Sequence, residues 1–274
     1  MNAAFSKIKA WVNKVAETPP FTLAAQQVLR HVRTTAMTRV RWNIAERPHY
    51  LLGVYRGAQQ AKVEGVSEIS VIEFGVASGA GLLALERCAR DVEIETGVRI
   101  KVFGFDSGGG LPESCGDYRD HPDFWTPCDY PMDVDALKAK LTDRTELVLG
   151  NVATTVPEFI NSSHPTVGFI AYDLDYYSST RHALAILSSL NRRNLRRVFM
   201  YFDDVDSDIN HRFAGELLAI DEFNDATEDV KIDRWRGVQR YSLFSHPLWL
   251  RRMYIAHDLQ AISATAPKRS PLRL

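Results

Sequence analysis

The stretch Val71–Leu85, VIEFGVASGAGLLAL, decides the fold of this chain. It opens with β-branched and aromatic residues, as strands do, and closes with an apolar run of helical character. Gly75, Gly79 and Gly81 lie at the joint, where glycine lets the backbone turn tightly and approach a ligand closely. The acid Glu73 stands near the end of the strand, and the helix that follows begins with free backbone N–H groups. The stretch therefore predicts a strand–turn–helix unit with a ligand site at the turn.

Strand and helix patterns alternate along most of the remaining chain. Apolar, β-rich runs predict strands at residues 69–75, 99–106, 145–151, 167–175 and 196–204. Helical periodicity predicts helices at residues 49–65, 81–97, 133–141, 153–160, 178–191 and 212–226. Two late runs, 238–244 and 250–256, have no helical segment between them and predict an antiparallel strand pair. Together these elements predict an α/β fold, a Rossmann-like doubly wound and mostly parallel sheet, with a helical N-terminal extension.

Charge is distributed unevenly along the chain. The net charge of the 274 residues is −1, but the first 44 hold seven Lys or Arg and one acid. We predict a basic helical N-terminal extension over residues 1–47, the α/β domain over 48–259 and a flexible basic tail over 260–274. The short helical pattern at 3–17 is followed by two prolines, so we expect it to pack on the domain or on a second copy of the chain rather than on a membrane surface. The near-neutral net charge and the lack of a basic stripe with interleaved aromatics argue against nucleic-acid binding.

Targeting features and cysteines indicate the compartment. No apolar run approaches the roughly 18 residues that a membrane-spanning helix requires. The N-terminus lacks the long apolar segment of a secretory signal. The three cysteines form no CxxC pair and no even-numbered disulfide framework. These features predict a cytoplasmic protein.

Polar residues follow the predicted parallel strands, at the point where each strand ends. These residues are Glu73, Asp106, Asn151, Asp173, Asp175, Asp203 and Asp204. Open α/β sheets bind their ligands beyond the carboxyl ends of the strands. We therefore expect the functional site at this edge of the sheet.

The spacing of the first loop helps to distinguish a dinucleotide cofactor from S-adenosylmethionine. Gly75-x-x-x-Gly79-x-Gly81 differs from the G-x-G-x-x-G of dinucleotide sites, and an acid just before it would repel a pyrophosphate. Asp106 can accept the hydroxyl groups of a ribose, and Asn151 can recognise an adenine edge. This combination favours S-adenosylmethionine over NAD. A NAD-dependent sugar oxidoreductase and a non-catalytic S-adenosylmethionine-binding scaffold are the alternatives.

Ordered motifs carry a family resemblance. EFGVASGAG at 73–81 resembles motif I of class I S-adenosylmethionine-dependent methyltransferases. Later segments resemble motifs of the macrocin O-methyltransferase (TylF-like) family, namely GFDSGGGLPE at 104–113, DLDYYSST at 173–180, FDDV at 202–205 and GELLAIDEF at 215–223. The chain departs from that pattern at Gly108, Gly109 and Val205. The resemblance implies the class I methyltransferase fold.

Donor-binding residues follow from this resemblance together with the strand ends. They are Glu73, Gly75, Ala77, Ser78, Gly79, Gly81, Asp106, Ser107, Asn151 and Asp173. The segment from Ser107 to Pro131, which contains three consecutive glycines, is a candidate lid over the donor.

The paired acids at the last two parallel strands suggest a metal. Close carboxylates repel each other unless a cation intervenes, and oxygen ligands suit Mg²⁺, although acids at a sheet edge can also simply be solvated. The resemblance implies Asp175, Asp203 and Asp204 as the ligands. Asp175 is the candidate general base and His211 the rival base. The predicted function is a Mg²⁺-assisted, S-adenosylmethionine-dependent O-methyltransferase that acts on a hydroxyl of a sugar or glycosylated small molecule.

Overall fold

The computed structural model describes residues 21–113, 116–190 and 192–265. The predicted basic helix at 3–17 and residues 266–274 of the predicted tail lie outside these ranges. None of the helices within them is long and apolar enough to cross a membrane.

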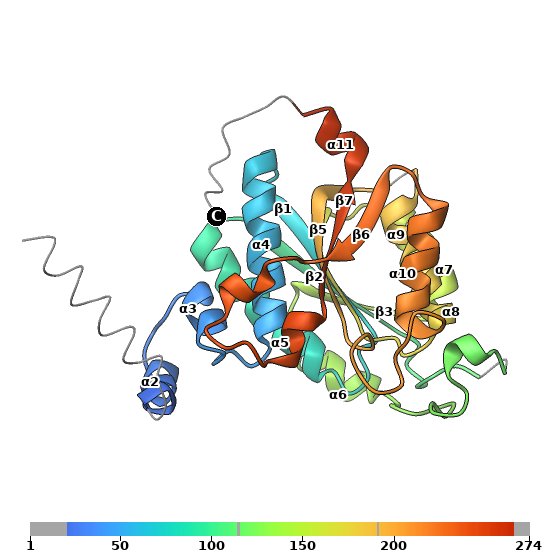
Figure 1. The fold of residues 1–274 in the computed structure, drawn as a ribbon, viewed down its shortest axis with the longest axis horizontal. Coiled ribbons are helices and arrows are strands. Elements are labelled where there is room, and N and C mark those ends of the chain that lie inside the picture. Colours follow the sequence, from blue (N-terminus) through green and yellow to red (C-terminus); the bar gives the residue numbers. More distant parts are fainter. Residues whose placement is uncertain (1–20, 114–115, 191, 266–274) are drawn as a thin grey trace, which may run out of the picture.

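A seven-stranded sheet forms the centre of the described structure (Figure 1). Its strands are β1 Glu68–Phe74, β2 Arg99–Asp106, β3 Thr145–Leu149, β4 Thr166–Tyr172, β5 Asn194–Phe202, β6 Val230–Arg234 and β7 Met253–Asp258. The order across the sheet is β3-β2-β1-β4-β5-β7-β6, and β7 runs antiparallel to both of its neighbours while the other pairings are parallel. The predicted mostly parallel, doubly wound sheet is confirmed.

Helices cover both faces of this sheet, each with its own apolar core. On one face lie α4 Pro48–Glu64 and α5 Ala80–Thr96, and on the other α7 Val152–Asn161, α8 Tyr177–Ala183, α9 Ala185–Ser188 and α10 Gly215–Ala226 (Figure 1). The remaining helical elements are α2 Phe21–Arg30, α3 Ala36–Arg41, α6 Val134–Lys138, α11 Leu259–Ser263, η1 Tyr118–Asp120, η2 Val238–Tyr241 and η3 Leu248–Arg251. Strands that are buried on both sides read as continuous apolar runs, which is why β1 and β4 were recognisable in the sequence.

The edge of the sheet differs from the prediction. The segment predicted as a strand at 238–244 begins as the 3₁₀ helix η2, after Gly237 turns the chain at φ 87°. The strand that pairs with β7 is β6, whose sequence VKIDR did not stand out because it is short and alternates apolar with charged residues. The prediction of an antiparallel strand pair at the sheet edge was right, but one of its two strands, predicted at 238–244, was assigned to the wrong segment.

The ends of the domain are less separate than the predicted boundaries suggest. Ala36 and Val40 of α3 are fully buried in the same core as α4, so this part of the predicted N-terminal extension packs within the domain. At the other end, α11 begins at Leu259 and continues into the predicted tail, with Asp258 capping its first turn.

Candidate active site

A cavity of about 340 Å³ opens at the carboxyl ends of the parallel strands. Residues at or just after the ends of β1 to β5 line it, namely Gly75, Asp106, Asn151, Asp173 and Asp203. The chain leaves β1 for β2 on one side, whereas β4 pairs with β1 on the other, so this is the point where the strand order reverses. The volume lies at the lower end of the range for small-molecule sites.

The glycine loop between β1 and α5 meets the cavity at its first residues. Gly75 has φ 83°, and a Cβ atom there would lie 1.7 Å from the carbonyl oxygen of Asp173. The backbone N–H of Asp173 donates to the carbonyl of Phe74 at 2.9 Å, which holds the two strand ends together. Gly75 and Ala77 line the cavity. Glycine is therefore required at 75 because two backbones cross there.

Glu73, a predicted donor contact, instead lies beneath the start of α5. Its side chain is buried, and its Oε1 accepts a hydrogen bond of 2.5 Å from the hydroxyl of Tyr50. A Cβ atom at Gly81 would lie 2.0 Å from that same oxygen, so Gly81 leaves room for the carboxylate. Burial raises the pKa of Glu73 to about 7, against the effect of the Tyr50 hydrogen bond. Glu73 and Gly81 thus support the loop from inside.

Two more loop residues predicted to contact the donor do not line the cavity. Gly79 has φ 87°, and a Cβ atom there would lie 2.3 Å from Leu137 of α6. Ser78 is likewise absent from the cavity wall. The physical reason is that α5 starts at Ala80. The second half of the loop therefore leads away from the cavity into the first turn of α5.

Asp106 holds two loops at once. Its Oδ2 accepts hydrogen bonds from the backbone N–H groups of Val76 and Ala77, both at 2.9 Å. Its Oδ1 accepts from the N–H of Gly108 at 2.6 Å. Each carboxylate oxygen keeps further acceptor capacity, and the residue lines the cavity.

Ser107 and Asn151 also reach the cavity, and both have local partners. The hydroxyl of Ser107 donates to the carbonyl of Gly110 at 2.6 Å. The side-chain oxygen of Asn151 accepts from the N–H of Ala153 at 2.8 Å and caps α7. The capping leaves the amide NH₂ of Asn151 as the group free to meet a ligand.

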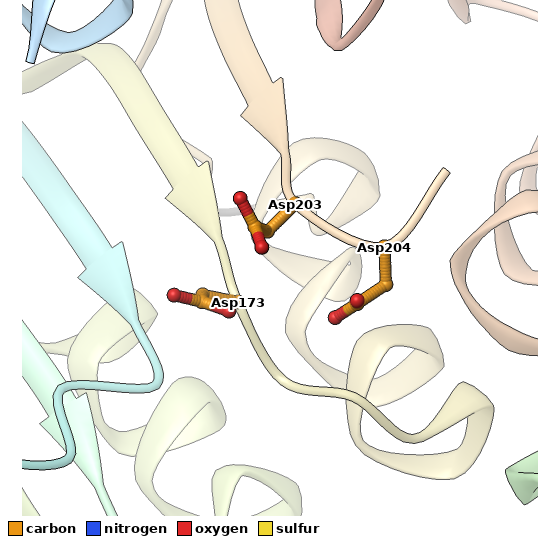
Figure 2. A group of neighbouring side chains, drawn as sticks. All are labelled: Asp173, Asp203 and Asp204. Carbon is orange, nitrogen blue, oxygen red and sulfur yellow. The ribbon is translucent and has the colours of Figure 1, made fainter. Parts of the chain in front are cut away.

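Three carboxylates gather between the ends of β4 and β5. Oxygens of Asp173, Asp203 and Asp204 all lie within 4.8 Å of one another (Figure 2). The predicted set had Asp175 in place of Asp173. Asp175 lies two residues further on, at φ 61°, and also lines the cavity.

Crowding of like charges is visible in the proton affinities of these acids. Loss of hydration and the charge of Asp204 raise the pKa of Asp175 to about 8. Burial and Asp203 raise the pKa of Asp204 to about 6, although Arg252 opposes this. The pKa of Asp173 is raised well above its usual range by burial, and then by Asp203 and Asp204. The carboxylates are thus brought together without enough positive charge to neutralise them.

One buried oxygen in this group has no hydrogen-bond partner among the described residues. Asp204 Oδ2 is buried and accepts no hydrogen bond within the described residues. The backbone N–H of Asp204 donates to Oε2 of the fully buried Glu216 at 2.9 Å, which fixes the chain at this point. A buried oxygen without a donor is costly unless a ligand satisfies it.

The rival base, His211, does not line the cavity. It is exposed, and its ring packs edge-on against that of His121, with the ring centroids 5.3 Å apart. His121 in turn lies against Gly215 at the start of α10. The position of His211 in the sequence, soon after the paired acids, did not reveal that the intervening loop leads away from the cavity.

The predicted lid segment contributes wall residues that the sequence did not single out. Trp125, Asp129 and Tyr130 line the cavity together with Leu111 and Pro112. Hydrogen bonds between Leu111 and the Cys128–Asp129 turn fold the segment back on itself. The aromatic residues in a long loop after a strand end were the available signal.

Comparisons with known proteins bear on the fold. No protein-family model matches the chain, and no curated protein matches its sequence. A crystal structure of CalS11, a calicheamicin methyltransferase, is similar at a TM-score of 0.54 with 18% identity, and the match covers 88% of this chain and 93% of that chain.

Two further solved structures are more distant. An apo structure of CalS11, a TDP-rhamnose 3'-O-methyltransferase, gives a TM-score of 0.44 with 18% identity over 88% of this chain and 95% of that chain. The O-methyltransferase TomG from Streptomyces achromogenes, in complex with SAM, gives 0.43 with 10% identity over 86% and 94%. At these identities the likeness concerns the fold and not the activity. The chain has the Rossmann-like fold of class I methyltransferases.

Proposed function

We propose that this protein is an S-adenosylmethionine-dependent O-methyltransferase similar to the TylF-like family, assisted by a divalent cation. The acceptor is a hydroxyl of a sugar or glycosylated small molecule. One observation carries the proposal: a single cavity at the strand-order reversal joins the Gly75–Ala77 loop and Asp106 to a group of close carboxylates. The first part suits a nucleoside donor, and the second suits a cation and an acceptor hydroxyl.

The donor end of the cavity fits S-adenosylmethionine in its chemistry. Asp106 offers acceptor oxygens for ribose hydroxyls, and Asn151 offers an amide NH₂ for an adenine edge. Val152 and Leu111 supply apolar wall. The donor supplies the methyl group, and these residues would bind and orient it. Glu73 has no direct role in this proposal, because it lies under the loop.

The acidic end fits a divalent cation. Asp203 and Asp204 would hold it together with Asp173, which replaces the Asp175 of our sequence-based prediction. The unpartnered Asp204 Oδ2 supports this set, because a cation would satisfy it. Hard oxygen donors and a partly open site suit Mg²⁺. A cation bound there would lower the pKa of an acceptor hydroxyl.

Asp175 is the base that we favour for the acceptor proton. It lines the cavity next to the carboxylate group, where its carboxylate can accept the proton of a hydroxyl bound beside the cation. His211 is disfavoured because it packs against His121 instead of facing the cavity. A cytoplasmic location and the absence of a nucleic-acid partner stay predictions.

A NAD-dependent sugar oxidoreductase is the second candidate, and the glycine loop argues against it. Gly79 and Gly81 make room for Leu137 and Glu73, so they do not form the phosphate-binding turn of a dinucleotide site. A non-catalytic donor-binding scaffold is also disfavoured, since it would have no use for crowded carboxylates beside the donor site.

The test separates the donor from the cation. Calorimetry with S-adenosylmethionine, and NAD as the comparison, measures donor binding without any acceptor. Methyl transfer to an acceptor found by mass-spectrometric screening is then measured in chelator and with added Mg²⁺. Chelator and Asp204→Asn should each lower transfer by orders of magnitude, while donor affinity stays within a few fold. Asp208→Asn, an exposed acid in the following loop, is the matched control.

Two results would count against the proposal. Absence of S-adenosylmethionine binding would remove the donor assignment. Full transfer in chelator would remove the cation and leave a metal-free carboxylate as the base.

A further inference from the structure

Asp203 is held at one of its two carboxylate oxygens. The hydroxyl of Tyr201 donates to Oδ1 at 2.5 Å, and Nη1 of Arg252 donates to the same oxygen at 2.7 Å. Among the described residues no side chain or backbone group donates to Oδ2. Asp203 is at the same time a member of the carboxylate group between β4 and β5 (Figure 2). The two donors therefore leave one oxygen of this acid free.

The fold places both donors by long-range packing. Tyr201 is buried, and its ring stacks on that of His49 in the first turn of α4, with centroids 4.1 Å apart. Arg252 is the residue directly before β7, and its backbone carbonyl accepts a hydrogen bond from the N–H of Phe202 at 3.0 Å. The antiparallel strand thus brings a guanidinium beside the end of β5. Because the ring of Tyr201 is buried and stacked on His49, its hydroxyl is held in position to donate to Oδ1 of Asp203.

We propose that Tyr201 and Arg252 are positioning residues, which bind Oδ1 of Asp203 and so reserve Oδ2 for the divalent cation. The inference rests on the proposed function, because it concerns the same cation site. Groups that hydrogen-bond a ligating carboxylate orient it, and their loss typically lowers metal affinity by about 10- to 100-fold. Neither residue lines the cavity, so each acts through Asp203 and not on the acceptor.

Arg252 also has an ordinary electrostatic effect that must be kept apart from positioning. A guanidinium 2.7 Å from Asp203 offsets its charge, so removal of that positive charge would by itself strengthen cation binding. Substitutions that conserve charge avoid this ambiguity. Tyr201→Phe removes only a hydroxyl. Arg252→Lys keeps the positive charge of the side chain, but shortens its reach and loses the planar fork of the guanidinium.

The control is a second buried tyrosine on the neighbouring strand. Tyr172 of β4 is fully buried, and its hydroxyl has no hydrogen-bond partner within the described residues. Tyr172→Phe therefore removes the same group without breaking a bond to a carboxylate. It reports how far the loss of a buried hydroxyl alone affects the site.

The experiment measures Mn²⁺ binding to the full chain by electron paramagnetic resonance, without donor or acceptor, and the unfolding midpoint of each variant in parallel. We expect Tyr201→Phe and Arg252→Lys each to weaken Mn²⁺ binding by about tenfold, and the double variant by about 100-fold. Tyr172→Phe should bind Mn²⁺ as the parent chain does. A purely structural role would lower the unfolding midpoint and leave the affinity of the folded protein unchanged.

The outcomes separate the two levels of inference. If the parent chain binds no Mn²⁺, or if it binds Mn²⁺ and Asp203→Asn leaves that binding unchanged, the cation site of the proposed function is wrong. If the parent binds Mn²⁺, Asp203→Asn abolishes binding, and the folded charge-conserving variants bind as tightly as the parent, the positioning role is wrong while the site stands.

Discussion

Replacement of Glu73 by Gln isolates the effect of one buried acid on the stability of the fold. Glu73 is 1% exposed, lies under the glycine loop, and accepts the Tyr50 hydroxyl through Oε1. Glutamine keeps the shape and the acceptor oxygen but cannot ionise. Any change in the pH dependence of stability therefore reports the ionisation of this carboxylate.

The sign and size follow from the two proton affinities. The pKa of Glu73 is about 7 in the folded chain, against an ordinary value of 4.5, mainly because burial disfavours the charged form. The folded chain thus binds this proton more tightly than the unfolded chain does. The resulting stabilisation is fully present below about pH 4.5 and is lost as the pH rises through 7. At 1.36 kcal/mol per pKa unit, the total loss is about 3 kcal/mol, of which roughly 2 to 3 falls between pH 5 and pH 8.

Urea unfolding at pH 5 and pH 8, in chelator and without donor, measures this loss. The parent chain should lose roughly 2 to 3 kcal/mol more than Glu73→Gln over that interval. Glu68→Gln is the control, because Glu68 starts the same strand with its side chain 39% exposed. Its profile should follow the parent chain. If the Glu73→Gln profile also runs parallel to the parent, Glu73 does not carry the proton and the reasoning from its burial is refuted.

Two other substitutions test the same loop. Gly81→Ala should destabilise the fold by about 1 to 3 kcal/mol, because its Cβ would lie 2.0 Å from Glu73 Oε1, and Gly109→Ala, which meets no atom within 4 Å, is its control in the same denaturation assay. Equal midpoints for both variants would show that the carboxylate simply moves aside. Asp106→Ala should weaken S-adenosylmethionine binding in calorimetry by about 1.5 to 3 kcal/mol, since it removes charge-assisted hydrogen bonds and also releases the loop N–H groups of Val76 and Ala77. Unchanged donor affinity in a folded Asp106→Ala variant would contradict the assignment of Asp106 to the ribose.

The strand ends were predictable because their placement depends only on sheet geometry. Parallel strands end at one edge, so polar residues that follow successive strands must meet there. Asp106, Asn151, Asp173 and Asp203 accordingly share one cavity, although up to 97 residues separate them in the chain. No knowledge of packing was needed for this part of the site.

The glycines show where such reasoning stops. Glycine spacing predicts close approach but does not say what approaches. Packing assigns Gly75 to the Asp173 backbone, Gly79 to Leu137 and Gly81 to Glu73. A missing Cβ has the same appearance in a sequence whether a ligand or the protein itself fills the space, which is why Gly79 and Gly81 were assigned to the donor.

The sequence by itself determined the layered α/β architecture and the edge that carries the site, because both follow from apolar periodicity and from the order of elements along the chain. Tertiary structure alone decided that β6 pairs with β7, that Asp173 joins Asp203 and Asp204, and that Arg252 reaches Asp203. These outcomes depend on which segments pack side by side, and on the directions in which the side chains at the strand ends point. Periodicity reports only the few residues around a position, whereas Arg252, the partner of Asp203, lies 49 residues away, just before a strand that runs in the opposite direction.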